Sequence, residues 1–598
     1  MPAASTPRSL RTAQLVLTII AGGLLVVIVA MLAWVGIRGA LAYSELRSAE
    51  TSARAAMDTI SDPAQTAPHI AEFASHAASA HDLTSDPVWR LAEAAPWAGP
   101  QLRAVSTIAA AADGVAREAL VPLSDVVSAF SVDAFRPVDG RIDTAVFREI
   151  AGPARTGADA VADAAASVSA LDDAPLLGPV REAVEEVATL LDTGASATDA
   201  LARAAHLLPA MLGADGERSY LIAFQNNAEW RSLGGIVGAM AVVRTADGAI
   251  EMTAQGSSSD FSRFDESVLP LEPELDRLFE ARPGRFVQNV TQIPDFTIGG
   301  PLAREMWQRQ TGQQVDGVIA TDPVALSYIL AATGPVDLPT GDVLTSDNAV
   351  SLLLNDVYLR YEQPRDQDAF FAAAAAAVFD RLATGAADPA ALITALGKAG
   401  DERRLLLWSA DADDQAVLAG TTLAGELPVS TADDAAFGVY LNDGTGSKMD
   451  YYVTADTSLT WESCTLDARG RNAAPITLQV TVTNTAPADA ATSLPTYITG
   501  GGGFGVPAGI SRTVAYLYLP TDAALTSAVR SDRAGFGGGT HDGRQVLAFG
   551  SDLAPGESIT ATVTVIPPGE GASSATASVT PTIDANRPTS VVATCGAP

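Results

Sequence analysis

A cluster of polar residues follows an apolar run near the middle of the chain. The run Tyr220–Phe224 suits a buried strand. The polar residues that follow are Asn226, Asn227, Glu229 and Arg231, and two glycines end the stretch. Amide, carboxylate and guanidinium groups at the carboxyl end of a strand are a usual arrangement of a ligand site. A polar loop that only joins two strands would have the same sequence, so both interpretations stand.

A second polar group could complete such a site. It consists of Arg360, Arg365 and Asp366, just before an alanine-rich helical stretch. Forked guanidinium groups bind phosphates, and carboxylate or amide oxygens hold a divalent cation beside a pyrophosphate. We therefore predict that Arg231, Arg360 and Arg365 converge on one ligand. The alternative is that the last two are solvated partners of nearby aspartates.

Familiar catalytic motifs are missing from the sequence. The five histidines form no HExxH pattern and the two cysteines form no CxxC pair. The sequence also has no GxSxG elbow with a histidine partner and no dinucleotide fingerprint after a strand. Gly444–Lys448 and Thr499–Gly505 are rich in glycine but lack the spacing of a phosphate loop. We therefore predict no metal-ligand motif, assign no catalytic residue, and expect Thr499–Gly505 to be a mobile loop between strands.

Four stretches of the sequence resemble a known family. They are WRLAEAAPWAGPQL from Trp89, FQNNAEWRSLGGIVG from Phe224, VDGVIATDPVALSYILAATGPV from Val315 and SKMDYY from Ser447. Together they are similar to the bacterial envelope family catalogued as domain of unknown function 4012. The resemblance implies an extracytoplasmic protein of the cell envelope or cell wall, and it implies no particular reaction.

The order of elements from Tyr220 to Leu382 also resembles the LytR-CpsA-Psr fold. Enzymes of that family attach glycopolymers, carried on polyprenyl pyrophosphate, to peptidoglycan. The segments that carry this resemblance are the polar stretch after Phe224, a later strand at Val315–Ile319, a turn at Thr333–Val336 and the arginine segment before Ala369–Leu382.

The LytR-CpsA-Psr resemblance implies a ligand and a cofactor. The ligand would be a polyprenyl-linked saccharide or a cell-wall glycan, and the cofactor a divalent cation such as magnesium. If the chain is an enzyme, the resemblance implies a phosphotransferase. The family's Arg-x-Asp-Thr sequence is absent, because Ser232 and Leu233 follow Arg231. The catalytic residues therefore stay unassigned.

Charge and cysteine content restrict the partners and the compartment. A formal net charge of −33 would repel a nucleic acid, so we predict no nucleic-acid partner. The two cysteines, Cys464 and Cys595, both fall in the last quarter of the chain. In an exported domain such a pair is expected to form a disulfide, and two buried thiols are the alternative.

An uncharged apolar segment lies close to the start of the chain. Residues 15–37 are long enough, at about 1.5 Å per residue, to cross a hydrocarbon layer of roughly 30 Å as a transmembrane helix. The tail of residues 1–14 carries Arg8 and Arg11 and no acid, which predicts a cytoplasmic N-terminus and an exported remainder. We expect an uncleaved signal-anchor in the cell membrane. A cleaved signal peptide is the alternative, since Ala40–Ala42 fits a small-x-small cleavage pattern.

The rest of the chain divides into three parts by pattern. Residues 42–212 are alanine-rich with aliphatic residues at helical spacing, which predicts a helical stalk or bundle. Residues 213–432 alternate strands and helices, which predicts a central α/β domain. Residues 433–598 carry short alternating runs between glycine- and proline-rich turns, which predicts a β-sandwich. The expected fold class is therefore multidomain α+β.

Particular elements are expected in the central part. The expected strands are Tyr220–Phe224, Ile236–Arg244, Ile250–Gln255 and Gly317–Ala320, and the expected helices are Pro301–Gln310, Pro323–Ala332, Asn348–Leu359 and Ala369–Leu382. Asp322 is expected to cap the helix that begins at Pro323, because an aspartate there can accept hydrogen bonds from free backbone amides.

Two functions from different classes fit these features. The first is a membrane-anchored envelope protein whose central domain binds a lipid-linked or anionic glycan, with a divergent glycopolymer transferase as its catalytic form. The second is a non-catalytic structural or interaction scaffold of the cell envelope. Only the first needs the polar residues to gather around one ligand.

Overall fold

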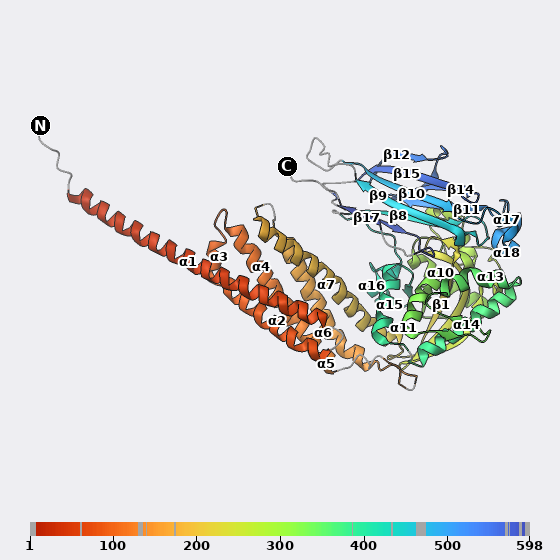
Figure 1. The fold of residues 1–598 in the computed structure, drawn as a ribbon, viewed down its shortest axis with the longest axis horizontal. Coiled ribbons are helices and arrows are strands. Elements are labelled where there is room, and N and C mark those ends of the chain that lie inside the picture. Colours follow the sequence, from red (N-terminus) through yellow and green to blue (C-terminus); the bar gives the residue numbers. More distant parts are fainter. Residues whose placement is uncertain are drawn as a thin grey trace. The chain divides into compact units, whose positions relative to one another are not determined.

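The protein is a mixed α/β chain with one N-terminal apolar helix and several sheets (Figure 1). The computed structural model describes residues 8–59, 63–129, 136–138, 140–172, 175–385, 387–431, 434–461, 474–567, 572, 574–584 and 589–592. Two compact units are present, Met1–Ala134 with Thr144–Pro209, and Phe135–Asp143 with Ala210–Pro598. Cys464 and Cys595 lie outside the described residues, so their disulfide stays a prediction, as do the domain boundaries at 212 and 432.

The first unit is helical. Its elements are α1 (Arg8–Asp58), α2 (Pro63–Thr84), α3 (Pro87–Ala92), α4 (Gly99–Val115), a π-helical turn (Ala116–Leu120), α5 (Val121–Ala129), α6 (Ala145–Ser169) and α7 (Gly178–Met211), which continues into the second unit. Alanines such as Ala42, Ala77 and Ala104 are fully buried where the helices meet. Because these side chains are small, the helices can approach closely, which explains the alanine-rich composition of this part.

Helix α1 is long and apolar enough to cross a membrane. Over Gly23–Asp58, the part of α1 whose side chains are described, the most apolar window has a mean hydropathy of 2.3. None of that window is buried in the protein. A signal sequence near the N-terminus would meet the same criterion of length and composition.

The second unit contains a five-stranded sheet in the order β3-β2-β1-β4-β7. Its strands are β1 (Arg218–Arg231), β2 (Gly234–Ala246), β3 (Ala249–Ser257), β4 (Gly317–Thr321) and β7 (Leu406–Ser409). Strands β1 and β4 are parallel, and the other neighbours are antiparallel. The expected strands and the helices that begin at Pro301, Pro323 and Ala369 all fall inside observed elements, whereas Asn348–Leu359 is divided by a π-helical turn at Leu352–Asp356.

Helices lie on both faces of this sheet (Figure 1). The helices of this part of the chain are α8 (Pro273–Phe279), α9 (Arg282–Arg285), α10 (Phe296–Thr311), α11 (Pro323–Thr333), α12 (Ala349–Ser351), α13 (Val357–Arg360), α14 (Pro364–Ala383), α15 (Pro389–Asp401) and α16 (Ala412–Leu418), with a small ribbon of β5 (Val336–Asp337) and β6 (Val343–Leu344). Alternate residues of β1 face opposite ways. Leu221 and Ala223 are buried against α10, whereas Ile222 and Phe224 are only partly buried on the other face.

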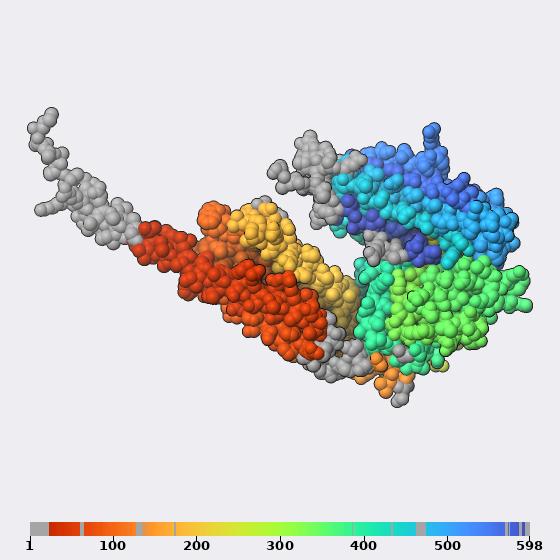
Figure 2. Space-filling model, viewed as in Figure 1, coloured from red at the N-terminus to blue at the C-terminus, as the bar shows by residue number. Residues whose placement is uncertain are grey.

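Two further sheets complete the second unit. One has the order β12-β15-β10-β9 and the other β13-β14-β11-β8-β16-β17. Their strands are β8 (Asp434–Asp443), β9 (Val453–Trp461), β10 (Ile476–Asn484), β11 (Ser511–Tyr518), β12 (Ala524–Arg530), β13 (Gly537–His541), β14 (Arg544–Leu553), β15 (Ser558–Ile566), β16 (Ser574–Val579) and β17 (Thr589–Val592), with α17 (Ala490–Ser493) and α18 (Thr496–Thr499) in a connection. The two sheets share one apolar core, and their blue surface rests on the green α/β part (Figure 2).

Strand β1 joins the two halves of this unit. Its residue Trp230 is fully buried and belongs to the core between the two last sheets, among Phe437, Leu478 and Val563. The strand therefore contributes Leu221 to one core and Trp230 to another. This sharing explains why both halves form one compact unit.

Replacing Trp230 with alanine should destabilise the second unit. A large-to-small change in a closed core loses the transfer energy of the ring and leaves a cavity, so we expect Trp230→Ala to lower the free energy of unfolding by about 3–5 kcal/mol. Urea denaturation of the detergent-solubilised chain measures this loss. The control Val429→Ala, at a side chain 76% exposed, should stay within about 0.5 kcal/mol of the parent, and equal losses in the two variants would contradict the shared core.

Candidate functional site

The polar stretch after Phe224 is part of a strand and not a loop. Strand β1 continues to Arg231, with an irregular register between Asn226 and Trp230 where it pairs with β2. The turn to β2 brings the backbones so close that a Cβ on Gly235 would lie 2.1 Å from the carbonyl oxygen of Asn226. This hairpin with a bulge allows neighbouring side chains of one strand to point into different surroundings.

A cavity of about 1180 Å³ lies between the sheet and α14. Its floor is the face of the sheet that α10 does not cover, including Ile222, Phe224, Ile236, Met252 and Ile319. Its other walls come from α11, the π-helical turn and α14, with the side chains Leu326, Ile329, Leu353, Leu354, Phe371, Ala374, Ala375, Val378, Phe379 and Leu382. Most of the wall is therefore apolar. The volume of the cavity is slightly above that of common ligand pockets.

Helix α14 is tied over the cavity at its first turns. The hydroxyls of Ser257 and Ser259 each donate a hydrogen bond to the Asp368 carboxylate, both at 3.0 Å. These bonds join the end of β3 to the start of α14. The alanines that follow leave the space beneath the helix open, because their side chains are too short to reach the sheet.

One end of the cavity is polar. There the Lys448 ammonium donates to the Glu229 carboxylate, and the two side chains are only 7% and 8% exposed. The same ammonium lies 4.5 Å from the centre of the Tyr358 ring and 5.0 Å from that of Tyr497. The Asn226 amide donates to the Tyr358 hydroxyl at 2.6 Å. An ion pair that lies against two aromatic rings is well shielded from water, which strengthens both contacts.

The pKa values at this end follow from burial and charge. Burial by itself would lower the pKa of Lys448, but the Glu229 carboxylate outweighs it and the pKa is raised. Burial raises the pKa of Tyr358 to about 12. Both groups therefore keep their protons at neutral pH, and Lys448 stays a cation.

The polar end reaches the surface beside a glycine-rich turn. Gly500–Gly502 forms a short helical turn, and the Phe504 ring packs so closely on Gly446 and Gly500 that a Cβ at either would lie 2.8 Å from it. Tyr497 and Phe504 are 37% and 48% exposed. The segment expected to be a loop between strands thus supplies Gly500 and Phe504 to the cavity wall.

Three more charged groups are buried next to this end. Arg231 donates to the side-chain oxygen of Asn289 at 2.8 Å and to its neighbour's backbone carbonyl at 2.7 Å. The backbone amide of Trp230 donates to Asp450 at 2.8 Å. Burial raises the pKa of Asp443 to about 6, against the opposing charge of Arg231, and burial also raises the pKa of Asp450.

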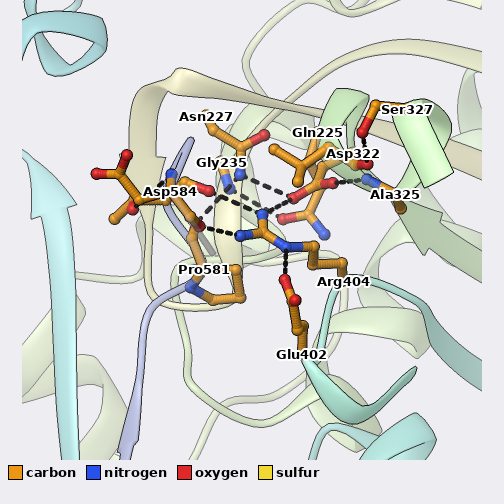
Figure 3. Close-up of polar contacts among 12 residues, drawn as sticks. Gln225, Asn227, Gly235, Asp322, Ala325, Ser327, Glu402, Arg404, Pro581 and Asp584 are labelled. Atoms are coloured by element: carbon orange, nitrogen blue, oxygen red, sulfur yellow. Dashed lines mark hydrogen bonds and ion pairs between the residues drawn. The ribbon is translucent and has the colours of Figure 1, made fainter. Parts of the chain in front are cut away.

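A second buried network lies on the other side of β1 (Figure 3). Arg404 is fully buried and donates to Glu402 at 2.7 Å, to Asp322 at 2.8 Å and to the backbone carbonyl of Thr582 at 2.7 Å. Asp322 also accepts from the Asn227 amide at 3.0 Å. Burial alone would lower the pKa of Arg404, but Asp322 and Glu402 raise it.

This network connects distant parts of the chain to one another. Asp322 accepts from the backbone amide of Ala325 at 2.8 Å, which confirms the expected cap of α11. Asn227 also donates to the carbonyl of Pro581 at 3.1 Å. Residues 581–584, far along the sequence, are thereby held to β1 and α11. No sequence pattern pointed to Arg404, since two adjacent arginines before a short strand are usually exposed.

The seven residues predicted to bind a ligand fall in three places. Asn226 and Glu229 line the cavity, whereas Asn227 and Arg231 are buried and are not part of its wall. The remaining three, Arg360, Arg365 and Asp366, lie on the surface.

The predicted convergence of the three arginines is not observed. Arg360 pairs with Asp342 at 2.7 Å, and Arg365 is 86% exposed and lies 3.6 Å from Asp366. Arg231 has its own buried partners. The physical reason is that each guanidinium finds a carboxylate, an amide or water close to its own backbone position. Among the described residues of the cavity wall none is an arginine.

The described residues do not fit the divalent cation that the LytR-CpsA-Psr resemblance implies. The Lys448 ammonium stands where a cation on Glu229 would have to lie, and the side-chain oxygen of Asn226 already accepts from the backbone amide of Ala228 at 3.0 Å. Among the residues that the structure describes, no three histidine, cysteine, aspartate or glutamate side chains lie together in a way that could hold a metal.

The family resemblance is confirmed for part of the chain. Residues 215–358 match the family described as Protein of unknown function (DUF4012). Residues 215–358 are therefore a DUF4012 segment. It spans β1, β4, α11 and Tyr358, so it supplies the sheet floor and part of the polar end of the cavity. The search of curated proteins gives no match for this chain.

Two motifs noticed in the sequence meet at the polar end. Glu229 and Trp230 of the DUF4012 segment contact Lys448 and Asp450 of the SKMDYY stretch, which lies outside the match. The place of Lys448, Tyr358 and Tyr497 in the cavity wall was not predicted from the sequence. The resemblance of SKMDYY to the family was the available signal. Its contact with Glu229 and Trp230 could not be predicted from the sequence, because the two stretches are far apart in the chain.

Breaking the ion pair from one side should cost more than removing it whole. Lys448→Met leaves the Glu229 carboxylate buried without a cation, so we expect a loss of about 3–5 kcal/mol in the free energy of unfolding. Combining Lys448→Met with Glu229→Gln should recover most of that loss, because no buried charge is left unpaired. Urea denaturation of the two single variants and the double variant measures the coupling, and strictly additive losses would contradict a direct pair.

The raised pKa of Asp443 predicts a pH dependence. Because the native state keeps a proton that the unfolded chain releases, stability falls as pH rises from the ordinary value of 3.8 to about 6. Asp443→Asn removes this titration. We expect the variant to gain up to about 3 kcal/mol over the parent at pH 7 and little at pH 4.

Denaturation curves at both pH values test this expectation. The exposed Asp347→Asn is the matched control and should shift little at either pH. A constant difference between Asp443→Asn and the parent across the window would refute the buried titration.

Proposed function

We propose that this is a membrane-anchored protein of the cell envelope whose central cavity binds a lipid-linked saccharide. The single observation that supports this most is the form of the cavity, a long apolar chamber with one polar end that reaches the surface. A ligand with a hydrocarbon chain and a sugar head matches both parts of it.

Anchoring would bring the protein to the source of such a ligand. Helix α1 is long and apolar enough to span the bilayer, and the arginines of the N-terminal tail favour a cytoplasmic start. The chain that follows the span would then lie outside the cytoplasm, on the side of the leaflet in which lipid-linked saccharides are presented. The lipid need not cross an aqueous phase over any distance.

The apolar wall suits the chain of the lipid. Ile222, Phe224 and Ile319 are only partly buried although they sit on the floor of a large sheet. Covering such side chains with hydrocarbon stabilises a complex by about 25 cal/mol for each Å² of apolar surface removed from water. The Ala374 and Ala375 side chains of α14 leave width for a chain with branches.

The polar end suits a saccharide better than a bare pyrophosphate. Four carboxylates line the cavity, from Glu229, Asp322, Glu362 and Asp368, and the one lysine, Lys448, is already paired. An anion would therefore meet net negative charge. Sugar hydroxyls can donate to carboxylates and amides, and the exposed faces of Tyr497 and Phe504 can pack on a sugar ring.

We propose binding and not glycopolymer transfer. Transfer of the LytR-CpsA-Psr kind would use guanidinium groups around the pyrophosphate, and Arg231, Arg360 and Arg365 have partners elsewhere. The scaffold function stays as the outcome to which a failed binding test would point.

Filling the cavity should abolish lipid binding without unfolding the protein. Gly238 lines the floor on β2, and a Cβ placed there meets nothing within 4 Å. We expect Gly238→Phe to lower affinity for a polyprenyl-linked saccharide by roughly tenfold or more, which is about 1.4 kcal/mol. Gly550→Phe is the matched control, since Gly550 is also a strand glycine with open space around its Cβ and lies outside the cavity wall.

Titration of the detergent-solubilised chain with three probes measures this effect. The probes are a polyprenyl-linked saccharide, polyprenyl phosphate alone and the free saccharide. We expect the first to bind most tightly, because it fills both parts of the cavity. Unchanged affinity in Gly238→Phe, or no binding of the linked probe to the parent chain, would sink the proposal.

A further inference from the structure

The turn between α2 and α3 contacts the end of the apolar part of α1. Trp34, 49% exposed, donates from its indole to Asp86 at 3.4 Å. Arg38 lies 2.9 Å from the same carboxylate and donates to the backbone carbonyl of Leu83 at 2.9 Å. The residues just before α3 therefore sit beside the end of the expected span, where α1 passes from hydrocarbon to water.

Helix α3 is held at the same level. The Trp89 ring is 1% exposed and lies 3.6 Å from the Cβ position of Gly39, immediately after the span. Its indole donates to the carbonyl of Leu102 at 3.4 Å. The connection from α3 to α4 is thus fixed at the end of the helical unit from which the span emerges.

A second connection lies beside the first. The Gln101 side chain donates to the carbonyl of Pro175 at 2.7 Å and accepts from the backbone amide of Leu177 at 3.0 Å. The start of α7 therefore stands next to the start of α4. In the ribbon and space-filling views, these orange and gold segments lie at the end where red α1 leaves the unit (Figures 1 and 2).

Both connections expose large apolar side chains. Trp97 is 82% exposed, Leu177 is 64% exposed and Leu91 is 61% exposed. Other exposed residues in and beside the two connections include Ala94, Pro96, Asp172, Pro175 and Pro179. By contrast Trp89, eight positions before Trp97, is buried in the same motif-bearing stretch, so one tryptophan fixes the connection and the other is left in the open.

We infer that this end of the helical unit lies on the bilayer, with Trp97, Leu91 and Leu177 inserted at the level of the lipid headgroups. The inference rests on the membrane anchoring proposed above. The argument for lipid as the occupant is continuity, because the exposed side chains surround the point where a membrane-spanning helix enters the unit. Tryptophan is the residue that most favours the interface, since its ring is apolar and its indole N–H can bond to headgroups or water.

The contact has a consequence for function. A single helix would let the helical unit tilt freely about its exit from the membrane. The inserted side chains Leu91, Trp97 and Leu177 beside it would set the direction in which that unit projects. The exposed end is thus a second, shallow attachment to the membrane in addition to the span.

Site-directed spin labelling of the full chain tests the inference. The chain is placed in nanodiscs of phosphatidylglycerol and phosphatidylethanolamine, and labels are introduced by Trp97→Cys and Leu177→Cys. We expect a ratio of oxygen accessibility to nickel-chelate accessibility several-fold higher at these positions than at Met57→Cys. The signal of the parent chain, whose cysteines are Cys464 and Cys595, is subtracted.

Met57 is the matched control within the same unit. It is also a large apolar residue, 56% exposed, and it lies on α1 about 28 Å along the helix from Arg38 at 1.5 Å per residue. A label at Val29→Cys, within the span, reports on anchoring. A high accessibility ratio at position 29 with low ratios at positions 97 and 177 would overturn this inference alone. That result is expected if a protein partner, and not lipid, covers that face. Aqueous values at 29 as well would overturn the anchoring and this inference with it.

Discussion

The ion pair between Glu229 and Lys448 is the contact on which the organisation of the second unit depends. It is nearly inaccessible to water, and it joins the end of β1 to a segment more than two hundred residues later. Removing water from both charges is costly, and the pair is tolerated because each charge faces the other and the ammonium lies against two aromatic rings. The contact lies next to the bulge of β1. The neighbouring residue Trp230 enters the second core, and its backbone amide donates to Asp450 of the same later segment.

The cavity exists because the two faces of the central sheet are covered differently. Helix α10 packs directly on one face with Leu302, Met306 and Trp307, and fills it. Helix α14 crosses the other face with a run of alanines, and hydrogen bonds hold it at Asp368, at the Ala372 carbonyl and at Arg381. A close-packed interior would normally leave no such space. The distribution of large and small side chains between two helices therefore decides where a ligand can enter.

The two buried charge networks have separate roles in this arrangement. The Arg404 network holds residues 581–584 against β1 and caps α11, and every donor named for it points to a protein oxygen. The Glu229–Lys448 pair lies on the cavity wall, where a ligand would meet it. The first network also touches the cavity through Asp322, but its arginine is satisfied by protein oxygens away from the cavity wall. The helical unit adds a separate feature, an apolar end beside the exit of α1.

The local elements of this protein were determined by its sequence. Alternation placed β1, β2, β3 and β4, helical spacing placed α10, α11 and α14, and Asp322 was identified as a cap, since these features depend on neighbours within a few residues. The apolar span and the DUF4012 segment were likewise evident. The tertiary structure alone decided which charges meet: Glu229 found Lys448, whereas Arg360 found Asp342. Pairing of distant side chains depends on the crossing of strands and helices, which residue types and spacing do not specify.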